Sequence, residues 1–305
     1  MSVLYFFESI RNPILDAIVA IITMLGEELV FLALAIIIFW CVDKYQGYFL
    51  MAVGFIGTII NQFLKITFRI PRPWVLDKNF TIVESAREAA TGYSFPSGHT
   101  QSSVGTFFGL FKWNKNKWIK ILCIIPVILV PFSRLYLGVH TPKDVFVSFI
   151  IALALVFIMH PIIEKGRDNS KIMYVTLLFM LIISVASVLY VTLYNFPANV
   201  DMENLFSARK NAYKLLGCIL GIIVVYFVDK NYIDFETKAP LLFQIFKIVI
   251  GLALVLGVKE GTKPLLNMIF GGNLAAYSVR YFLVVLVAGI VWPFIFTKLS
   301  KKLNK

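Results

Sequence analysis

Ten apolar stretches follow one another along the chain, and they constrain its fold more than any other feature of the sequence. We place them at residues 13–25, 27–42, 47–68, 98–112, 118–136, 142–163, 172–194, 212–228, 240–258 and 276–297. A helix needs about 17 to 25 mostly apolar residues to cross the hydrocarbon of a bilayer. Only 15% of the residues are charged, whereas soluble domains carry about a quarter. These features exclude a soluble globular protein and a disordered chain, and they indicate a membrane protein.

The apolar stretches are expected to be helices. Lipid offers no hydrogen-bond partner to an open sheet edge, and no alternating pattern of the kind found in barrel strands is present. The predicted fold class is therefore an all-α polytopic membrane protein. The stretch 13–25 is short and contains Asp16, so it could also lie in the membrane interface.

The formal net charge of +12 is interpreted as a mark of topology, and no nucleic-acid partner is expected. Basic residues gather in the loop 112–120, in the segment 165–171 and at 298–305. The positive-inside rule places these segments on the cytoplasmic side. The loop 69–97, the turn 137–141 and the segment 195–211 then lie on the opposite side. The N-terminus lacks a basic region and a small-residue cleavage site, so we expect it to remain in the mature chain.

A first cluster of ionisable residues lies at the end of the stretch 47–68. Lys65 is near the end of this stretch, and Arg72 follows between two prolines that should stop the helix. An ammonium and a guanidinium at a helix end can form an anion site, because the planar guanidinium can bind two phosphate oxygens. Taken alone, the pair could also be two interfacial cations with snorkelling side chains.

A second cluster, Pro96-Ser97-Gly98-His99, opens the stretch 98–112. The free N–H groups of a helix start attract an anion, a serine hydroxyl adds a donor, and His99 can titrate near neutral pH. The alternative is a capped helix start with an incidental histidine.

The third cluster combines Arg134 with His140 and Asp144. The histidine and the aspartate are four residues apart, so on one helix they would share a face. The carboxylate would then hold one ring nitrogen and leave the other as a nucleophile or base. The same spacing is also found in ordinary stabilising pairs.

Taken together, the three clusters favour phosphoryl transfer. All lie on the predicted non-cytoplasmic side, and they supply a nucleophile, an orienting carboxylate, an acid for the leaving oxygen and positive charge for the phosphate. No Asp/Glu or Cys/His group suited to a metal lies near them, so we expect no metal and no cofactor. His160 is predicted to be structural, and Asp201, Glu203, Arg209 and Lys210 to be solvated residues or a rim of the site.

The three clusters resemble the signature of the type-2 phosphatidic acid phosphatase superfamily, which reads K-x6-R-P, P-S-G-H and S-R-x5-H-x3-D. The chain matches all three parts in order, over about residues 27–163. The resemblance implies that His140 is the nucleophile that forms a phosphohistidine, that Asp144 orients it, and that His99 protonates the leaving alcohol and then activates water. It further implies that the phosphate is held by Lys65, Arg72, Ser97, Gly98 and Arg134.

We therefore predict a six-helix phosphatase core in residues 1–163 and about four additional transmembrane helices, of unknown role, in residues 164–305. The expected activity is metal-independent hydrolysis of a lipid phosphate monoester or pyrophosphate, with membrane lipids as surroundings. The expected location is the bacterial plasma membrane, with the active site at its extracytoplasmic face. A phosphotransferase acting on an alcohol acceptor and a non-enzymatic transporter of anionic lipids stay open as alternatives. The sequence does not identify the lipid or the oligomeric state.

Overall fold

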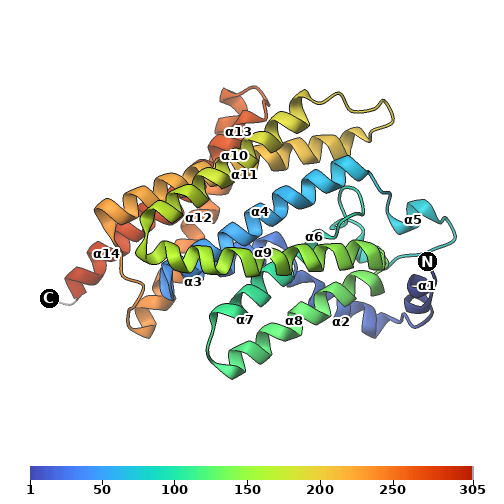
Figure 1. The fold of residues 1–305 in the computed structure, drawn as a ribbon, viewed down its shortest axis with the longest axis horizontal. Coiled ribbons are helices and arrows are strands. Elements are labelled where there is room, and N and C mark those ends of the chain that lie inside the picture. Colours follow the sequence, from blue (N-terminus) through green and yellow to red (C-terminus); the bar gives the residue numbers. More distant parts are fainter. Residues whose placement is uncertain (304–305) are drawn as a thin grey trace. The chain divides into compact units, whose positions relative to one another are not determined.

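The computed structural model describes residues 1–303, and within this range it contains helices and no β-strand (Figure 1). The α-helices are α1 (Ser2–Ser9), α2 (Pro13–Met24), α3 (Glu28–Cys41), α4 (Lys44–Phe68), α5 (Pro73–Leu76), α6 (Gly98–Ser103), α7 (Gly109–Trp113), α8 (Lys117–Tyr136), α9 (Pro142–Asp168), α10 (Ser170–Leu193), α11 (Met202–Val228), α12 (Leu241–Ile269), α13 (Ala275–Leu286) and α14 (Trp292–Leu303). A short 3-10 helix η1 (Glu84–Ala86) and three π-helical turns, η2 (Val104–Phe108), η3 (Asp229–Ile233) and η4 (Val287–Val291), complete the elements.

The prediction of an all-α polytopic membrane protein is confirmed. Within the described residues, seven helices are long and apolar enough to cross a membrane, and α2 and α3 together make an eighth candidate bent by 44°. Four of these helical segments follow residue 169, as predicted for the C-terminal half. The stretch 98–112 forms one continuous helical run from α6 through η2 to α7, but it is not among these candidate spans.

Two helices extend beyond the apolar stretches that predict them. α11 begins at Met202 rather than near 212, because Asp201 caps it: its Oδ1 accepts the N–H of Asn204 at 2.8 Å. α12 continues to Ile269 although its apolar stretch ends near 258, and it passes through Pro264. Both extensions are polar, and hydropathy marks only the part of a helix that suits lipid.

The chain divides into two compact units, which we describe separately. Unit 1 comprises Met1–Leu32, Phe49–Pro161 and Asn195–Ala208, and unit 2 comprises Ala33–Tyr48, Ile162–Tyr194 and the chain from Arg209 onwards. The units interleave along the sequence because several helices pass from one to the other. The predicted division into a phosphatase core, residues 1–163, and a C-terminal extension, residues 164–305, concerns function, so it stays a prediction.

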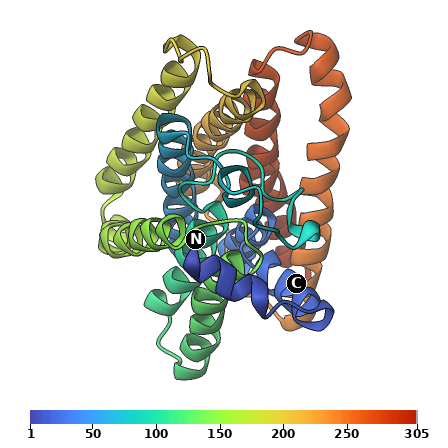
Figure 2. The same ribbon diagram turned by 90° about the vertical axis from the view of Figure 1, so that its right-hand side faces the viewer.

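In unit 1, the long loop 69–97 packs on the helices instead of projecting from them (Figure 2, cyan). Val83, Ala86 and Ala90 of the loop form a buried apolar cluster with Phe7 and with the end of α8. The N–H of Val83 donates to the carbonyl of Leu137 at 3.2 Å. This packing gives the loop a defined path, along which it carries Thr91, Gly92, Tyr93 and Ser94.

In unit 2, α13 packs against both α11 and α12, and α12 and α13 run side by side in both ribbon views (Figures 1 and 2, orange and red). Ser278 of α13 donates a hydrogen bond to the carbonyl of Tyr213 in α11 at 2.7 Å. The contact is close because α11 has a glycine at Gly217, where a Cβ atom would lie 2.1 Å from the carbonyl oxygen of Ser278. A larger residue at this position would separate the two helices.

Candidate functional site

α9 begins with a reciprocal cap that fixes Asp144. The backbone N–H of Thr141 donates to Asp144 Oδ2 at 2.8 Å, and the N–H of Asp144 lies 3.4 Å from Thr141 Oγ1. Pro142 takes the first helical position, where its missing N–H has no cost. The arrangement resembles a capping box, and it holds the Asp144 carboxylate in the first turn of α9, close to His140.

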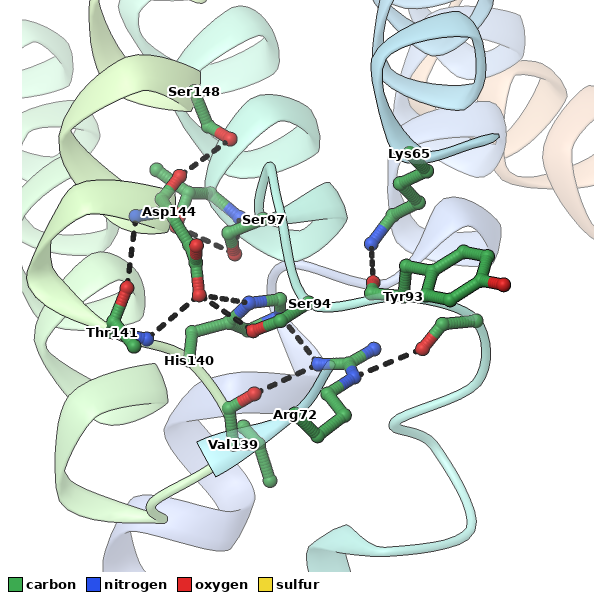
Figure 3. A network of polar contacts seen from close by, with 12 residues as sticks. Lys65, Arg72, Tyr93, Ser94, Ser97, Val139, His140, Thr141, Asp144 and Ser148 are labelled. Atoms are coloured by element: carbon green, nitrogen blue, oxygen red, sulfur yellow. Dashed lines mark hydrogen bonds and ion pairs between the residues drawn. The ribbon is translucent and has the colours of Figure 1, made fainter. Parts of the chain in front are cut away.

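His140 lies between this carboxylate and a guanidinium (Figure 3). Its Nδ1 is 3.5 Å from Asp144 Oδ2, and its Nε2 is 2.9 Å from Nη1 of Arg72. Because a guanidinium can only donate, Nε2 must accept, and the proton of the neutral ring then resides on Nδ1. Burial lowers the pKa of His140 well below its usual value, and the positive charges of Arg72, Lys65 and Arg134 lower it further. The ring is therefore neutral, with the Nε2 lone pair directed at a cation.

One geometric expectation for this pair is wrong. We expected His140 and Asp144 to share a face of one helix, but α9 begins at Pro142, so His140 lies in the turn before it. The two side chains approach because the cap between Thr141 and Asp144 draws the carboxylate back toward the residues that precede the helix.

Asp144 has a further donor that the sequence did not single out. Ser94 Oγ donates to Asp144 Oδ2 at 2.6 Å, and both side chains are almost completely buried. The backbone N–H of Ser97 and the hydroxyl of Ser148 donate to the carbonyl oxygen of Asp144, at 3.1 and 3.0 Å. Asp144 thus joins the loop 69–97 and the start of α6 to α9.

Arg72 is held in place by backbone carbonyls. Its Nη1 donates to the carbonyl of Val139 at 2.8 Å, its Nε to that of Gly92 at 3.1 Å, and its Nη2 to that of Thr91 at 2.7 Å. These carbonyls come from the turn before His140 and from the loop 69–97. They fix the plane of the guanidinium beside the Nε2 atom of His140 (Figure 3).

Lys65 lies in the last turn of α4, which ends at Phe68. Its ammonium donates to the carbonyl of Tyr93, and its side chain is buried. After the helix, Arg69 adopts a φ of 49°, which turns the chain toward Arg72. The cations of the first cluster are therefore placed by a helix end and the turn that follows it.

The second cluster forms the start of α6. Ser97 is the N-cap, and its Oγ accepts the N–H of Thr100 at 3.4 Å and the hydroxyl of Thr100 at 3.0 Å. Both contacts use the oxygen as an acceptor, so the hydroxyl proton of Ser97 stays available. At Gly98, a Cβ atom would meet no protein atom closer than Asn61 Oδ1 at 4.0 Å. The Nε2 atom of His99 is buried and has no hydrogen-bond partner among the described residues.

Arg134, the last cation of the site, is completely buried at the end of α8. Its Nη1 donates to the hydroxyl of Thr23 in α2 at 2.6 Å. Its Nε and Nη2 are buried and have no hydrogen-bond partner in the part of the chain that the structure describes. One edge of the guanidinium is thus anchored, and other donors remain for an anion.

The structure brings the three clusters together at one end of α4, α6, α8 and α9. The pKa of His140 is lowered by Arg72 and Lys65 and also by Arg134 and His99, which places residues of all three clusters near its ring. His160 lies elsewhere, near the rings of Trp113 and Phe49, with centroid distances of 5.1 and 5.7 Å. Among the rim candidates, Asp201 touches the loop, because its N–H donates to the hydroxyl of Tyr93 at 3.1 Å.

Two supporting residues, Ser94 and Thr23, were missed by the sequence reasoning. Ser94 lies next to the second cluster, and its proximity to that cluster could have marked it. Thr23 is 111 residues from Arg134 in sequence, and no local pattern points to it.

The site suits an anion with several oxygens. It combines a neutral imidazole with two guanidiniums, an ammonium and the N-terminus of a helix. The described residues contain no group of three or more His, Cys, Asp or Glu side chains that could hold a metal ion. An electron-pair donor and fixed positive charges are the elements with which a protein transfers a phosphoryl group.

Comparison with known proteins shows which family shares these features. Residues 46–168 match the PAP2 superfamily, and residues 213–305 match the PAP2 superfamily phosphatase transmembrane extension. The chain is 31% identical to undecaprenyl-diphosphatase BcrC of Bacillus subtilis, over 48% of this chain and 75% of that protein. It is 30% identical to phosphatidylglycerophosphatase B of Bacillus subtilis, over 51% of this chain and 79% of that protein.

A eukaryotic relative is matched over a smaller share of its length. The chain is 33% identical to a probable sphingosine-1-phosphate phosphatase of Dictyostelium discoideum, over 48% of this chain and 38% of that protein. No solved structure matches the chain. The resemblance noted in the sequence is confirmed by the family match and by the two Bacillus relatives: the chain belongs to the PAP2 superfamily.

Proposed function

We propose that the protein is a phosphatase that removes phosphate from a lipid phosphate monoester or pyrophosphate through a phosphohistidine at His140. The observation that carries this proposal is the position of His140, with Nδ1 facing Asp144 and Nε2 facing Arg72. The names of the relatives agree with the substrate class, because all three are phosphatases of lipid phosphates.

In the first step, the Nε2 lone pair of His140 gives up its hydrogen bond from Arg72 Nη1 and attacks phosphorus, while the guanidinium turns its N–H groups to the phosphate oxygens. The bond from phosphorus to the leaving oxygen breaks, and His99 delivers a proton to that oxygen. The ring becomes positive as the N–P bond forms, and Asp144 stabilises this charge from the Nδ1 side. Lys65, Arg72 and Arg134 balance the charge on the other phosphate oxygens, with the Ser97 hydroxyl and the Gly98 N–H as further donors.

In the second step, His99 takes a proton from water, and the water oxygen attacks phosphorus. The N–P bond breaks, its electron pair returns to Nε2 of His140, and phosphate leaves. His99 is then protonated for the next turnover. No step needs a metal ion, because the side chains named here supply the nucleophile, the acid and the positive charge.

We further propose that the substrate is a lipid and that the site faces the extracytoplasmic side of a bacterial plasma membrane. The site lies at the ends of membrane helices, so an acyl or prenyl chain can stay in lipid while its headgroup reaches the cations. The basic loop between α7 and α8 is at the other end of the same helices, where the positive-inside rule places the cytoplasm.

The test is a phosphate-release assay with purified full-length protein in EDTA. The panel contains prenyl pyrophosphates, phosphatidate, phosphatidylglycerol phosphate, sphingoid phosphates and one water-soluble ester. We expect release from at least one lipid, inhibition by vanadate, and loss of turnover in a folded His140→Ala variant. An absolute requirement for Mg²⁺, or full activity of His140→Ala, would contradict the proposed mechanism.

A further inference from the structure

A second group of cations lies in unit 2, apart in sequence from the candidate site. Lys210 and Lys214 of α11 and Arg280 of α13 surround the rings of two tyrosines, Tyr277 and Tyr281. The Lys210 ammonium is 5.6 Å from the centre of the Tyr277 ring, and the Lys214 ammonium is 5.5 Å from that of Tyr281. The Arg280 guanidinium is 5.7 Å from the Tyr277 ring and 5.2 Å from the Tyr281 ring. Each ring is therefore shared by two cations.

The spacing of these residues places them on facing sides of two packed helices. Lys210 and Lys214 are four residues apart, as are Tyr277 and Tyr281, so each pair shares a helix face. The bond from Ser278 to the Tyr213 carbonyl, together with the close approach at Gly217, fixes α11 against α13. The cluster is thus built on two rigid elements of the same unit.

The cluster has no acidic partner of its own. Within the described residues, none of the three cations forms an ion pair, and Lys214 has only a 3.4 Å contact with Asn211 Oδ1. Glu260 of α12 interacts electrostatically with Arg280, but its carboxylate pairs with Lys259 at 3.1 Å. An excess of positive charge therefore remains between α11 and α13.

Arg280 distinguishes this cluster from ordinary interfacial cations. Its side chain is only 9% exposed, and its Nε is buried without a hydrogen-bond partner in the described chain. The Nε side of this guanidinium is enclosed, whereas a snorkelling arginine extends its whole head into water. A buried ionisable group in a membrane helix is costly, and its presence indicates a binding partner.

The depth of Arg280 suits a lipid headgroup. It is the sixth residue of the apolar helix that begins at Ala275, which places it about 8 Å along the helix axis from that end. The headgroup layer of a bilayer is about 5 to 8 Å thick on each side, so a cation this close to the end of a membrane helix is within reach of lipid phosphates.

We propose that Lys210, Lys214 and Arg280 form a binding site for the phosphate group of an anionic membrane phospholipid. The guanidinium and the two ammonium groups neutralise the phosphate. The site shares no residue with the catalytic and phosphate-binding groups named above, and it takes in Lys210, for which the sequence offered a solvated position or the rim of the active site. It gives the C-terminal extension a role in holding a lipid that is not hydrolysed.

The test measures lipid binding to the full-length protein in detergent by native mass spectrometry. The probes are phosphatidylglycerol, phosphatidylcholine and inorganic phosphate. The variants are Lys210→Gln/Lys214→Gln and Arg280→Gln, with Lys298→Gln as the matched control, because Lys298 also lies over an aromatic ring, 4.2 Å from that of Phe294. Because Arg280→Gln removes a buried side chain, the double lysine variant decides the result if the arginine variant does not fold.

We expect the wild type to retain phosphatidylglycerol in preference to phosphatidylcholine. The double variant and a folded Arg280→Gln should each bind it at least about tenfold more weakly, the loss typical of one charge-assisted hydrogen bond, and Lys298→Gln should bind as the wild type does. Unchanged binding in the double variant would overturn the proposal. Displacement of the lipid by millimolar inorganic phosphate would overturn the lipid as the ligand. An absence of phosphatase activity would refute the proposed function, and it would leave the lipid-binding measurement unaffected.

Discussion

Replacing Ser94 with alanine tests whether the orientation of Asp144 matters for turnover. The change removes one hydroxyl, whose Oγ donates to Asp144 Oδ2 at 2.6 Å. Asp144 keeps the N–H of Thr141 at 2.8 Å, so the carboxylate stays buried with one donor fewer. Ser94→Ala therefore perturbs the group that faces Nδ1 of His140 without altering His140 itself.

The expected size of the effect follows from the type of bond. A hydrogen bond to a charged group contributes about 1.5 to 3 kcal/mol. If the Ser94 bond is needed to hold Asp144 beside the imidazolium that forms in the transition state, this energy is lost from the barrier. Since each 1.36 kcal/mol is tenfold in rate, kcat/KM should fall about 10- to 150-fold.

The matched control is Ser103→Ala. Ser103 is also completely buried in unit 1, but its Oγ donates to the neutral carbonyl of Pro126 at 3.0 Å. Phosphate release from a lipid phosphate is measured for both variants, and the melting temperature shows that each is folded. Ser103→Ala should keep kcat/KM within about threefold of wild type, because its bond does not touch the site. Equal losses in the two variants would refute the role given to Ser94.

Three further predictions concern other parts of the site. Thr23→Val leaves the Arg134 Nη1 donor unpaired and should lower kcat/KM about tenfold, whereas Thr23→Ser should restore most of it; equal activities would contradict this anchor. Burial and nearby cations lower the pKa of His140. Its imidazole NMR resonance, assigned by comparison with His140→Ala, should therefore keep the chemical shift of the neutral ring as the pH falls through 6.5, whereas a titration midpoint at or above 6.5 would contradict the site. Gly26→Ala places a Cβ atom 2.7 Å from Val130 and 2.9 Å from the His99 carbonyl, and it should cost about 1–3 kcal/mol of stability, whereas Gly257→Ala, with open space, should cost none.

Much of the fold could be predicted because lipid imposes a simple rule. A helix that crosses a bilayer must be apolar over most of its length, so hydropathy located every membrane helix of the described chain. It did not locate the ends of α11 and α12, because polar helical turns outside lipid have no hydropathy signal. Those ends depend on local capping, as at Asp201.

The candidate site was predicted to different degrees for different residues. The three clusters fall on the same predicted side of the membrane and match the spacing of a known signature, so Lys65, Arg72 and His140 could be grouped from the sequence alone. The turn that places His140 ahead of α9 depends on the cap between Thr141 and Asp144, which spacing alone did not reveal. Contacts across long sequence separations, such as that of Thr23, depend on the packing of helices.

The most direct test of the phosphohistidine mechanism is to trap the phosphorylated protein. Full-length protein in EDTA is mixed with a lipid substrate that carries a radioactive phosphate and is quenched in alkali within one turnover. We expect label on His140, stable in alkali and released by acid as for an N–P bond, and no label in a folded His140→Ala variant. Label on any other residue, or phosphate release by the His140→Ala variant at the wild-type rate, would contradict it.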